Sequence, residues 1–193
     1  MIDPIRSRED LVKAVRRGLR PQYLFFWGHQ PLPNGEIGQS CLSQWWSARF
    51  QVGDQIYASA EHFMMAEKAR LFNDEVHWQK VLQTGSPKIA KQFGRQVQGF
   101  DEQTWAENRL RLVVAGNLAK FDQNRDLGQF LLQTGNKVLV EASPTDKVWG
   151  IGLRADDERA QNPEEWRGLN LLGFALMEVR ERLQHPSNRA TDA

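Results

Sequence analysis

Residues 59–69 read SAEHFMMAEKA and carry a carboxylate, an imidazole and an amine within a short, largely apolar stretch. Ser59 is a good N-cap, which places Glu61 in the first turn of a helix, where the helix dipole favours the ionised acid. Lys68 follows Glu61 by seven residues, so both side chains project from one face about two turns apart. An acid and an amine at this spacing can approach one ligand from two sides.

The same residues also have a purely structural interpretation, which the segment alone does not exclude. Glu61 and Lys68 would then be solvated surface charges, and His62 would be a packed or capped imidazole. Arg95 lies near the end of another short helical pattern, and it likewise has a functional and a structural interpretation. Its guanidinium can clamp a phosphate through two hydrogen bonds, or it can be an ordinary surface charge.

The sequence DKVWGIG at residues 146–152 sets an acid and an indole beside two glycines. Glycine lets the backbone approach a ligand closely, so Asp146, Trp149 and Gly150 are candidate site residues. The alternative is a tight turn with a buried tryptophan. Asn170 lies near the expected start of a helix, where its side chain would cap the helix or read the edge of a ligand.

Composition and charge set broad limits on the class of protein. A chain of 193 residues, 40% apolar and 25% charged, is typical of one globular domain. The net charge of +1 does not demand nucleic acid or an anionic membrane as partner. Cys41 is the single cysteine, so no intramolecular disulfide forms. With no signal peptide and no run long enough for a membrane span, we expect a cytoplasmic protein.

The four histidines are scattered without metal-ligand spacing, so a metal site is not expected. No cofactor is expected either. The apolar periodicity and the capping residues predict a chain rich in helices. Short strands do not alternate regularly with helices, which predicts an α+β fold rather than a doubly wound sheet. The irregular segment at 143–167 is long for a compact domain, and long ordered loops are often functional. Helices are expected at 7–17, 59–72, 74–83, 88–93, 101–121, 126–133 and 169–183, a hairpin at 52–57, and strands at 23–27 and 137–142.

Further short motifs lie along the chain: SAEH at 59–62, AEKA at 66–69, GR at 94–95, Trp105, KF at 120–121, LQTG at 132–135, VEAS at 140–143, Asp146 with WGIG at 149–152, and Gly168, Asn170, Leu172 and Gly173. Taken in order, these motifs resemble the YbiA-like, or NADAR, N-glycosidase family, from about residue 25 to residue 183. No single motif is decisive, and the ordered set with compatible spacing carries the resemblance. One departure lies at residues 42–45, which read LSQW where many members read LSNF. The longer amide side chain of Gln44 and the larger ring of Trp45 would change the shape of the substrate pocket where these residues line it.

The resemblance implies a compact, mostly helical α+β single domain with a small sheet of short strands. It divides the chain into an N-terminal helical extension at 1–22, a NADAR N-glycosidase domain at 23–184 and a flexible tail at 185–193. Members of the family hydrolyse N-glycosidic bonds, which implies the C1–N bond of a phosphorylated ribose as the target. One branch acts on ribosylamino-pyrimidine phosphates of riboflavin synthesis, and another removes ADP-ribose from guanine bases of nucleic acid.

The first substrate class is the leading expectation, with a small-molecule phosphorylated N-riboside as partner, and ADP-ribosylated nucleic acid is the alternative. A third possibility is a non-catalytic module that binds ADP-ribose or NAD. The oligomeric state is not predicted. Carried over residue by residue, the resemblance implies Glu61, Lys68 and Asp146 as catalytic residues, and Ser43, Trp45, His62, Arg95, Trp105, Trp149, Gly150 and Asn170 as substrate-binding residues.

Overall fold

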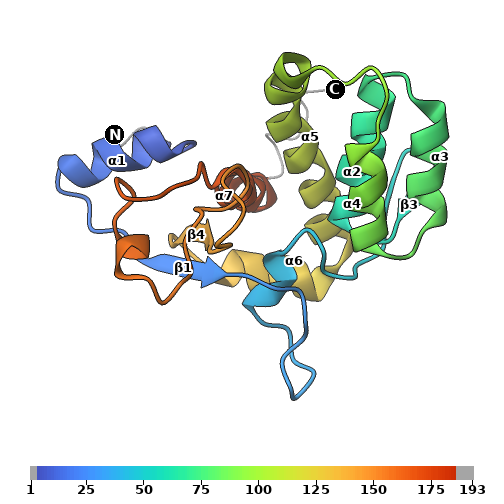
Figure 1. Cartoon of the computed structure of the whole chain (residues 1–193). Helices are drawn as coiled ribbons and strands as arrows, with labels where there is room; N and C mark the ends of the chain where they lie inside the picture. Colours follow the sequence, from blue (N-terminus) through green and yellow to red (C-terminus); the bar gives the residue numbers. More distant parts are fainter. Residues whose placement is uncertain (1–3, 186–193) are drawn as a thin grey trace. The chain divides into compact units, whose positions relative to one another are not determined.

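The computed structural model describes residues 4–185, and the greater part of the expected tail at 185–193 lies outside this range. The chain divides into two compact units (Figure 1). One comprises Met1–Ser43 together with Gln129–Ala193, and the other comprises Gln44–Gly128. Each unit has its own core.

A parallel pair of strands forms the centre of the first unit. Tyr23 of β1 pairs with Val138 of β4, and Phe26 pairs with Glu141 at the other end. The helix α7 packs on β4, and apolar side chains from the strands, the helices and the irregular segment share one core. This unit contains α1 (Arg8–Arg16), β1 (Tyr23–Phe26), η1 (Gln39–Leu42), β4 (Val138–Glu141), η2 (Glu158–Gln161) and α7 (Leu171–Gln184).

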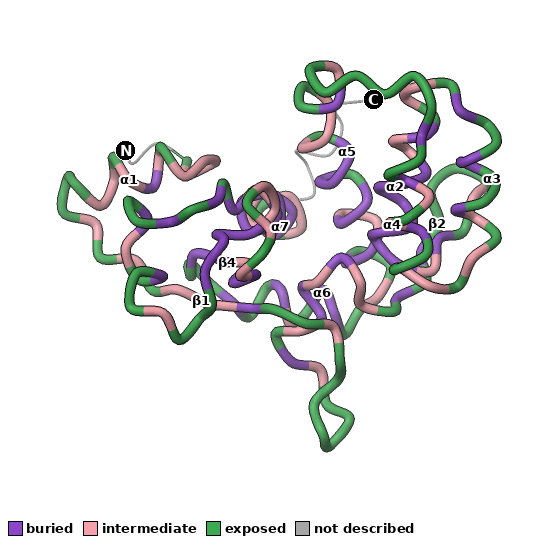
Figure 2. Tube along the Cα trace, viewed as in Figure 1, coloured by how far each residue is buried: buried purple, intermediate pink, exposed green. Residues whose placement is uncertain are grey.

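The second unit is a helical cluster with one antiparallel hairpin. The hairpin turns at Gly53, whose φ of +56° lies in the left-handed region that glycine adopts without strain. The helix α2 packs against α3, α4 and α5, and Figure 2 shows it buried along most of its length. This unit contains β2 (Phe50–Val52), β3 (Gln55–Tyr57), α2 (Ala60–Leu71), α3 (Glu75–Gln83), α4 (Pro87–Arg95) and α5 (Glu102–Gln123), and α6 (Arg125–Gln133) begins in it.

Four helices of the second unit begin directly after a residue whose side chain caps them, among them the predicted cap Ser59. In each case the side-chain oxygen accepts the backbone N–H three residues later, which satisfies a donor that the helix leaves unpaired. The four caps are Ser59 for α2, Asp74 for α3, Ser86 for α4 and Asp101 for α5.

Two glycines let neighbouring helices approach α2 closely. A Cβ atom at Gly116 of α5 would lie 2.4 Å from the ring of Phe63, and one at Gly94 of α4 would lie 2.0 Å from the sulfur of Met65. Both distances are too short for any side chain, so only glycine permits this packing as it stands. The approach of α4 sets Arg95, the next residue, beside the same helix.

The α+β fold with short strands is confirmed, and the element bounds agree with the expectations to within two or three residues. The strands of residues 4–185 form two separate two-stranded sheets, one parallel and one antiparallel, rather than a single small sheet. Within the same range, no helix combines the length and the apolarity needed to cross a membrane.

Candidate functional site

Three polar residues at the start of α2 are almost completely buried. Ser59, Glu61 and His62 are 1–2% exposed. Burying ionisable groups is costly unless the surroundings compensate, and proteins concentrate such groups at functional sites. The alternative that Glu61 is a solvated surface charge is therefore wrong, and α2 brings an acid into the interior of its unit.

Hydrogen bonds fix the backbone and the imidazole at this point. The backbone N–H of Glu61 donates to the carbonyl oxygen of Gln44 at 2.9 Å. The hydroxyl oxygen of Ser59 accepts the backbone N–H of His62 and lies 2.7 Å from its Nδ1. Burial lowers the pKa of His62, with the Thr84 backbone acting in the opposite direction, so the ring is neutral at neutral pH. His62 thus combines the packed and capped roles of the structural interpretation, and its part in substrate binding stays a prediction.

A buried amide pair extends this polar region from α2 to α5. The amide nitrogen of Asn117 donates to Oε1 of Gln44 at 2.7 Å and to the backbone oxygen of Val113 at 2.8 Å. Asn117 is fully buried, and so is Lys120, one turn further along α5. Sequence reasoning did not single out Asn117. Its burial could have been inferred from the sequence, because positions 117 and 120 are polar although they fall within the apolar stripe of a long helix.

Lys68 lies half-buried on α2, two turns after Glu61, among aromatic rings. Its Nζ atom is 4.0 Å from the ring centre of Phe100 and 5.5 Å from that of Trp105. Burial lowers the pKa of Lys68, while the charge of Glu102 raises it and that of Arg95 lowers it further. Such an amine can donate a proton, or in its neutral form attack a carbonyl carbon.

Arg95 is exposed at the last position of α4, close enough to Lys68 for their charges to interact. Two neighbouring cations beside an aromatic surface suit an anionic ligand such as a phosphate. Trp105 of α5 is buried, whereas Trp45 is half-buried with the Lys91 ammonium 5.9 Å from its ring centre. Arg95, Trp105 and Trp45 all belong to the Gln44–Gly128 unit, which also contains Glu61 and Lys68.

The other expected site residues belong to the first unit, where Asp146 shapes a turn. One carboxylate oxygen of Asp146 accepts the backbone N–H groups of Val148 and Trp149 at 2.9 and 2.8 Å. Its own N–H donates to the hydroxyl of Ser143. These bonds fix the backbone at Trp149, whose side chain is half-buried, and the catalytic role expected of Asp146 stays a prediction. Ser43, half-buried, follows directly after η1 in the same unit.

Asn170 fastens the start of α7 to β4. Its amide nitrogen donates to the backbone oxygen of Leu139 and its amide oxygen accepts from Glu141 N–H, both at 2.9 Å. The residue is fully buried with a φ of +55°, and its side chain makes no capping bond to α7. The expectation of a side-chain cap is thus wrong, because both amide atoms are taken by the strand. Gly150 is equally confined, since a Cβ atom there would lie 2.8 Å from the carbonyl oxygen of Glu141.

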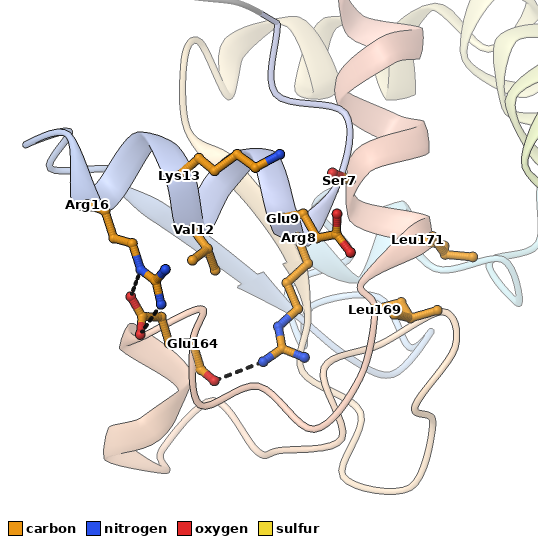
Figure 3. Close-up of a pocket in the computed structure, with 9 residues that line it drawn as sticks. All are labelled: Ser7, Arg8, Glu9, Val12, Lys13, Arg16, Glu164, Leu169 and Leu171. Atoms are coloured by element: carbon orange, nitrogen blue, oxygen red, sulfur yellow. Dashed lines mark hydrogen bonds and ion pairs between the residues drawn. The ribbon is translucent and has the colours of Figure 1, made fainter.

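An open pocket of about 500 Å³ lies in the first unit against α1, and it contains none of the expected site residues (Figure 3). Arg16 pairs with Glu164 across it, and the Arg8 guanidinium donates to the Glu164 backbone oxygen. The pocket is thus crossed by bonds that fasten α1 to the 143–167 segment. Among residues 4–185, no three His, Cys, Asp or Glu side chains are grouped so that they could hold a metal ion.

The model of the NADAR domain family matches residues 25–184, which include every expected site residue. The chain belongs to the NADAR domain family. Among the relatives of this NADAR chain is "N-glycosidase R617" of Acanthamoeba polyphaga mimivirus, which is 41% identical over 84% of the chain and 97% of its own length. "N-glycosidase YbiA" of Escherichia coli is 29% identical over 69% of the chain and 74% of its own length.

The NMR structure of E. coli YbiA resembles this NADAR fold with a TM-score of 0.67. The likeness covers 89% of this chain and 90% of that one at 23% sequence identity, which supports the fold. The names of the relatives confirm the expectation of a hydrolase that acts on N-glycosyl bonds. The names say nothing of which N-glycoside is cleaved.

Proposed function

We propose that this NADAR protein hydrolyses the C1–N bond of a phosphorylated ribosylamino-pyrimidine, an intermediate of riboflavin synthesis, and releases ribose 5-phosphate. The observation that carries the proposal is the arrangement along α2. A buried acid begins the helix, and a half-buried amine lies two turns later beside an exposed arginine and two aromatic rings.

The reaction needs stabilisation of an oxocarbenium-like sugar, an activated water and a protonated leaving group. Glu61 stabilises the positive charge at C1 and takes a proton from the attacking water. The ammonium of Lys68 gives a proton to the departing nitrogen. Water thus adds its hydroxyl to C1, and the base leaves with the proton that Lys68 supplies.

Binding of the substrate falls to the groups around Lys68. Arg95 binds the phosphate through its guanidinium, since it is exposed and adjacent to a second cation. Trp105 and Phe100 provide aromatic surfaces against which a planar base can stack. This arrangement needs neither a metal ion nor a cofactor.

A second role for Lys68 leads to a different intermediate. In its neutral form, the amine adds to C1 of the ring-opened sugar, which is an imine of the pyrimidine amine; the pyrimidine amine then leaves with a proton, and water hydrolyses the Schiff base left on Lys68 to release the sugar and the free lysine. The lowered pKa of Lys68 supports this route because it increases the neutral fraction. Borohydride added during turnover distinguishes the two, because it reduces a Schiff base to a stable adduct on Lys68 and leaves an acid–base enzyme unmodified.

The decisive test measures release of ribose 5-phosphate from the ribosylamino-pyrimidine phosphate by the wild type and by Glu61→Gln. A general acid or base contributes ~10²–10⁴-fold to rate, so we expect Glu61→Gln to lose at least ~10²-fold in kcat with its fold intact. Glu75→Gln is the matched control, since Glu75 is an exposed acid in the first turn of α3. Near-wild-type turnover by Glu61→Gln would refute the role of the acid.

ADP-ribosylated guanosine is assayed in parallel as the alternative substrate. Cleavage of this compound alone would assign the protein to the removal of ADP-ribose from guanine bases. Binding of either compound without turnover by the wild type would instead indicate a non-catalytic ADP-ribose or NAD module.

A further inference from the structure

The amide pair formed by Gln44 and Asn117 has one donor and one acceptor left over. Gln44 is 6% exposed and Asn117 is fully buried. Nε2 of Gln44 and Oδ1 of Asn117 have no hydrogen-bond partner within the described part of the chain. An unsatisfied buried polar group is costly, and natural proteins carry few of them.

The orientation of both amides follows from their surroundings. The Val113 carbonyl oxygen lies 2.8 Å from the Asn117 amide nitrogen, so turning that amide over would set two oxygens against each other. The same nitrogen then requires an acceptor at Gln44, which fixes Oε1 toward it at 2.7 Å. The unpaired atoms are therefore a true N–H donor on Gln44 and a true oxygen acceptor on Asn117.

The backbone of Gln44 is hydrogen-bonded to the backbone at the start of α2, which carries the acid of the proposed site. Gln44 accepts the backbone N–H of Glu61 at 2.9 Å through its own carbonyl oxygen. Gly116 precedes Asn117 and allows α5 to approach α2 at Phe63, two residues after Glu61. The unpaired donor and acceptor thus belong to residues that adjoin the first turns of α2, where Glu61 lies.

We infer that Gln44 and Asn117 bind a ribose hydroxyl next to the scissile bond, and that they make the enzyme prefer ribosides to 2-deoxyribosides. A hydroxyl is the smallest group that both accepts and donates a hydrogen bond, so it can satisfy the Gln44 donor and the Asn117 acceptor together. In glycoside hydrolysis, hydrogen bonds to the 2-hydroxyl strengthen in the transition state. This inference rests on the proposed function and goes beyond it by naming residues that recognise the sugar.

The departure at residue 44 bears on how this recognition is achieved. Family members with asparagine at this position have an amide that is one methylene shorter. The longer side chain of Gln44 carries its amide further from the backbone that anchors Glu61, to the position where it meets Asn117. Gln44→Asn is therefore expected to weaken the preference for ribose.

The test compares ribose 5-phosphate with 2-deoxyribose 5-phosphate as ligands of the full-length protein, measured by isothermal titration calorimetry. We expect the wild type to bind ribose 5-phosphate about tenfold more tightly, the effect of one well-made buried hydrogen-bonded group. Gln44→Met keeps the side-chain length and removes the amide, so the ratio of the two Kd values should fall to within about twofold. Affinity for the 2-deoxy sugar should stay within about twofold of the wild type.

Gln123→Met is the matched control, because the Gln123 amide is fully occupied by the backbone of Gln51. It should lower the Tm without changing the ratio of the two Kd values. A correctly folded Gln44→Met that keeps the tenfold ratio overturns the inference, and so does a wild type that binds both sugars equally. If the inference fails in either way but the wild type still cleaves an N-glycoside, the proposed function stands. A wild type that binds neither sugar and cleaves neither substrate refutes the inference and the proposed function together.

Discussion

At the scale of the residue, Lys68 shows how a local environment tunes a single group. Its ammonium lies over the Phe100 ring, which favours the charged form, while burial disfavours that form and lowers the pKa. The charged groups that face it are Glu102 and Arg95, and Arg109 lies 3.7 Å from Glu102. The protonation of Lys68 thus depends on a balance that a fully solvated lysine does not have.

The stability of the protein should depend on pH through Lys68. Its pKa is lower in the folded than in the unfolded chain, so the unfolded chain binds more protons between the two values and folding becomes more favourable as pH rises through this window. Lys68→Met lacks this gain. The Tm difference between wild type and Lys68→Met should therefore shift in favour of the wild type from pH 7 to pH 10.

Differential scanning calorimetry across this pH range provides the measurement. Lys80→Met, at an exposed position of α3, controls for the loss of a surface charge. A Tm difference for Lys68→Met that stays constant with pH would contradict a lowered pKa.

At the scale of the element, the contact between α2 and α5 positions the acid and the amide pair together. This contact depends on Gly116, because a Cβ atom there would meet the Phe63 ring at 2.4 Å. A ring cannot move aside as easily as the end of a flexible chain. The separation of the two helices is therefore set by one missing side chain.

Gly116→Ala should destabilise the protein and reduce its activity. Overpacking costs ~1–3 kcal/mol, partly offset by the ~1 kcal/mol that alanine gains over glycine within a helix. Forcing α5 away from α2 should also separate Asn117 from Gln44, so kcat/KM should fall by more than the loss of folded protein explains. Urea unfolding and steady-state kinetics measure the two effects.

The double variant Gly116→Ala with Phe63→Leu removes the ring that causes the clash. It should recover activity relative to Gly116→Ala alone. Failure to recover any activity, with both proteins folded, would show that the ring contact does not control the position of the amide pair.

At the scale of the whole molecule, α1 is part of a core although it precedes the matched NADAR region. Leu11 is fully buried and packs with Val140 and Phe174, which belong to β4 and α7. Arg8 adds hydrogen bonds to the backbone of Pro163 and Glu164. The helix α1 therefore supports the unit that holds Asp146 and Trp149.

Leu11→Ala should lower the free energy of unfolding by about 2–5 kcal/mol, the range for removing a buried leucine side chain. Lys13→Ala, at an exposed position of the same helix, should change it by less than about 0.5 kcal/mol. Chemical denaturation of the full-length chain measures both. Equal effects of the two substitutions would show that α1 does not contribute to the core.

The amino-acid sequence determined the features that depend on neighbouring residues. Ser59, Asp74, Ser86 and Asp101 begin their helices because each cap acts within three residues of its own position. Local turn chemistry likewise set the hairpin at Gly53, and the spacing of Glu61 and Lys68 fixed their common face. The resemblance to the NADAR family was also available from ordered motifs alone.

Only the tertiary structure decided the features that join distant segments. It paired β1 in parallel with β4, drew both amide atoms of Asn170 to that strand, and buried Gln44 against Asn117. No local pattern encodes these contacts, because the free energy of a polar side chain depends on the partner it meets and on the water it loses. The sequence alone does not distinguish an asparagine that caps a helix from one that is bonded to a strand or one that contacts a ligand.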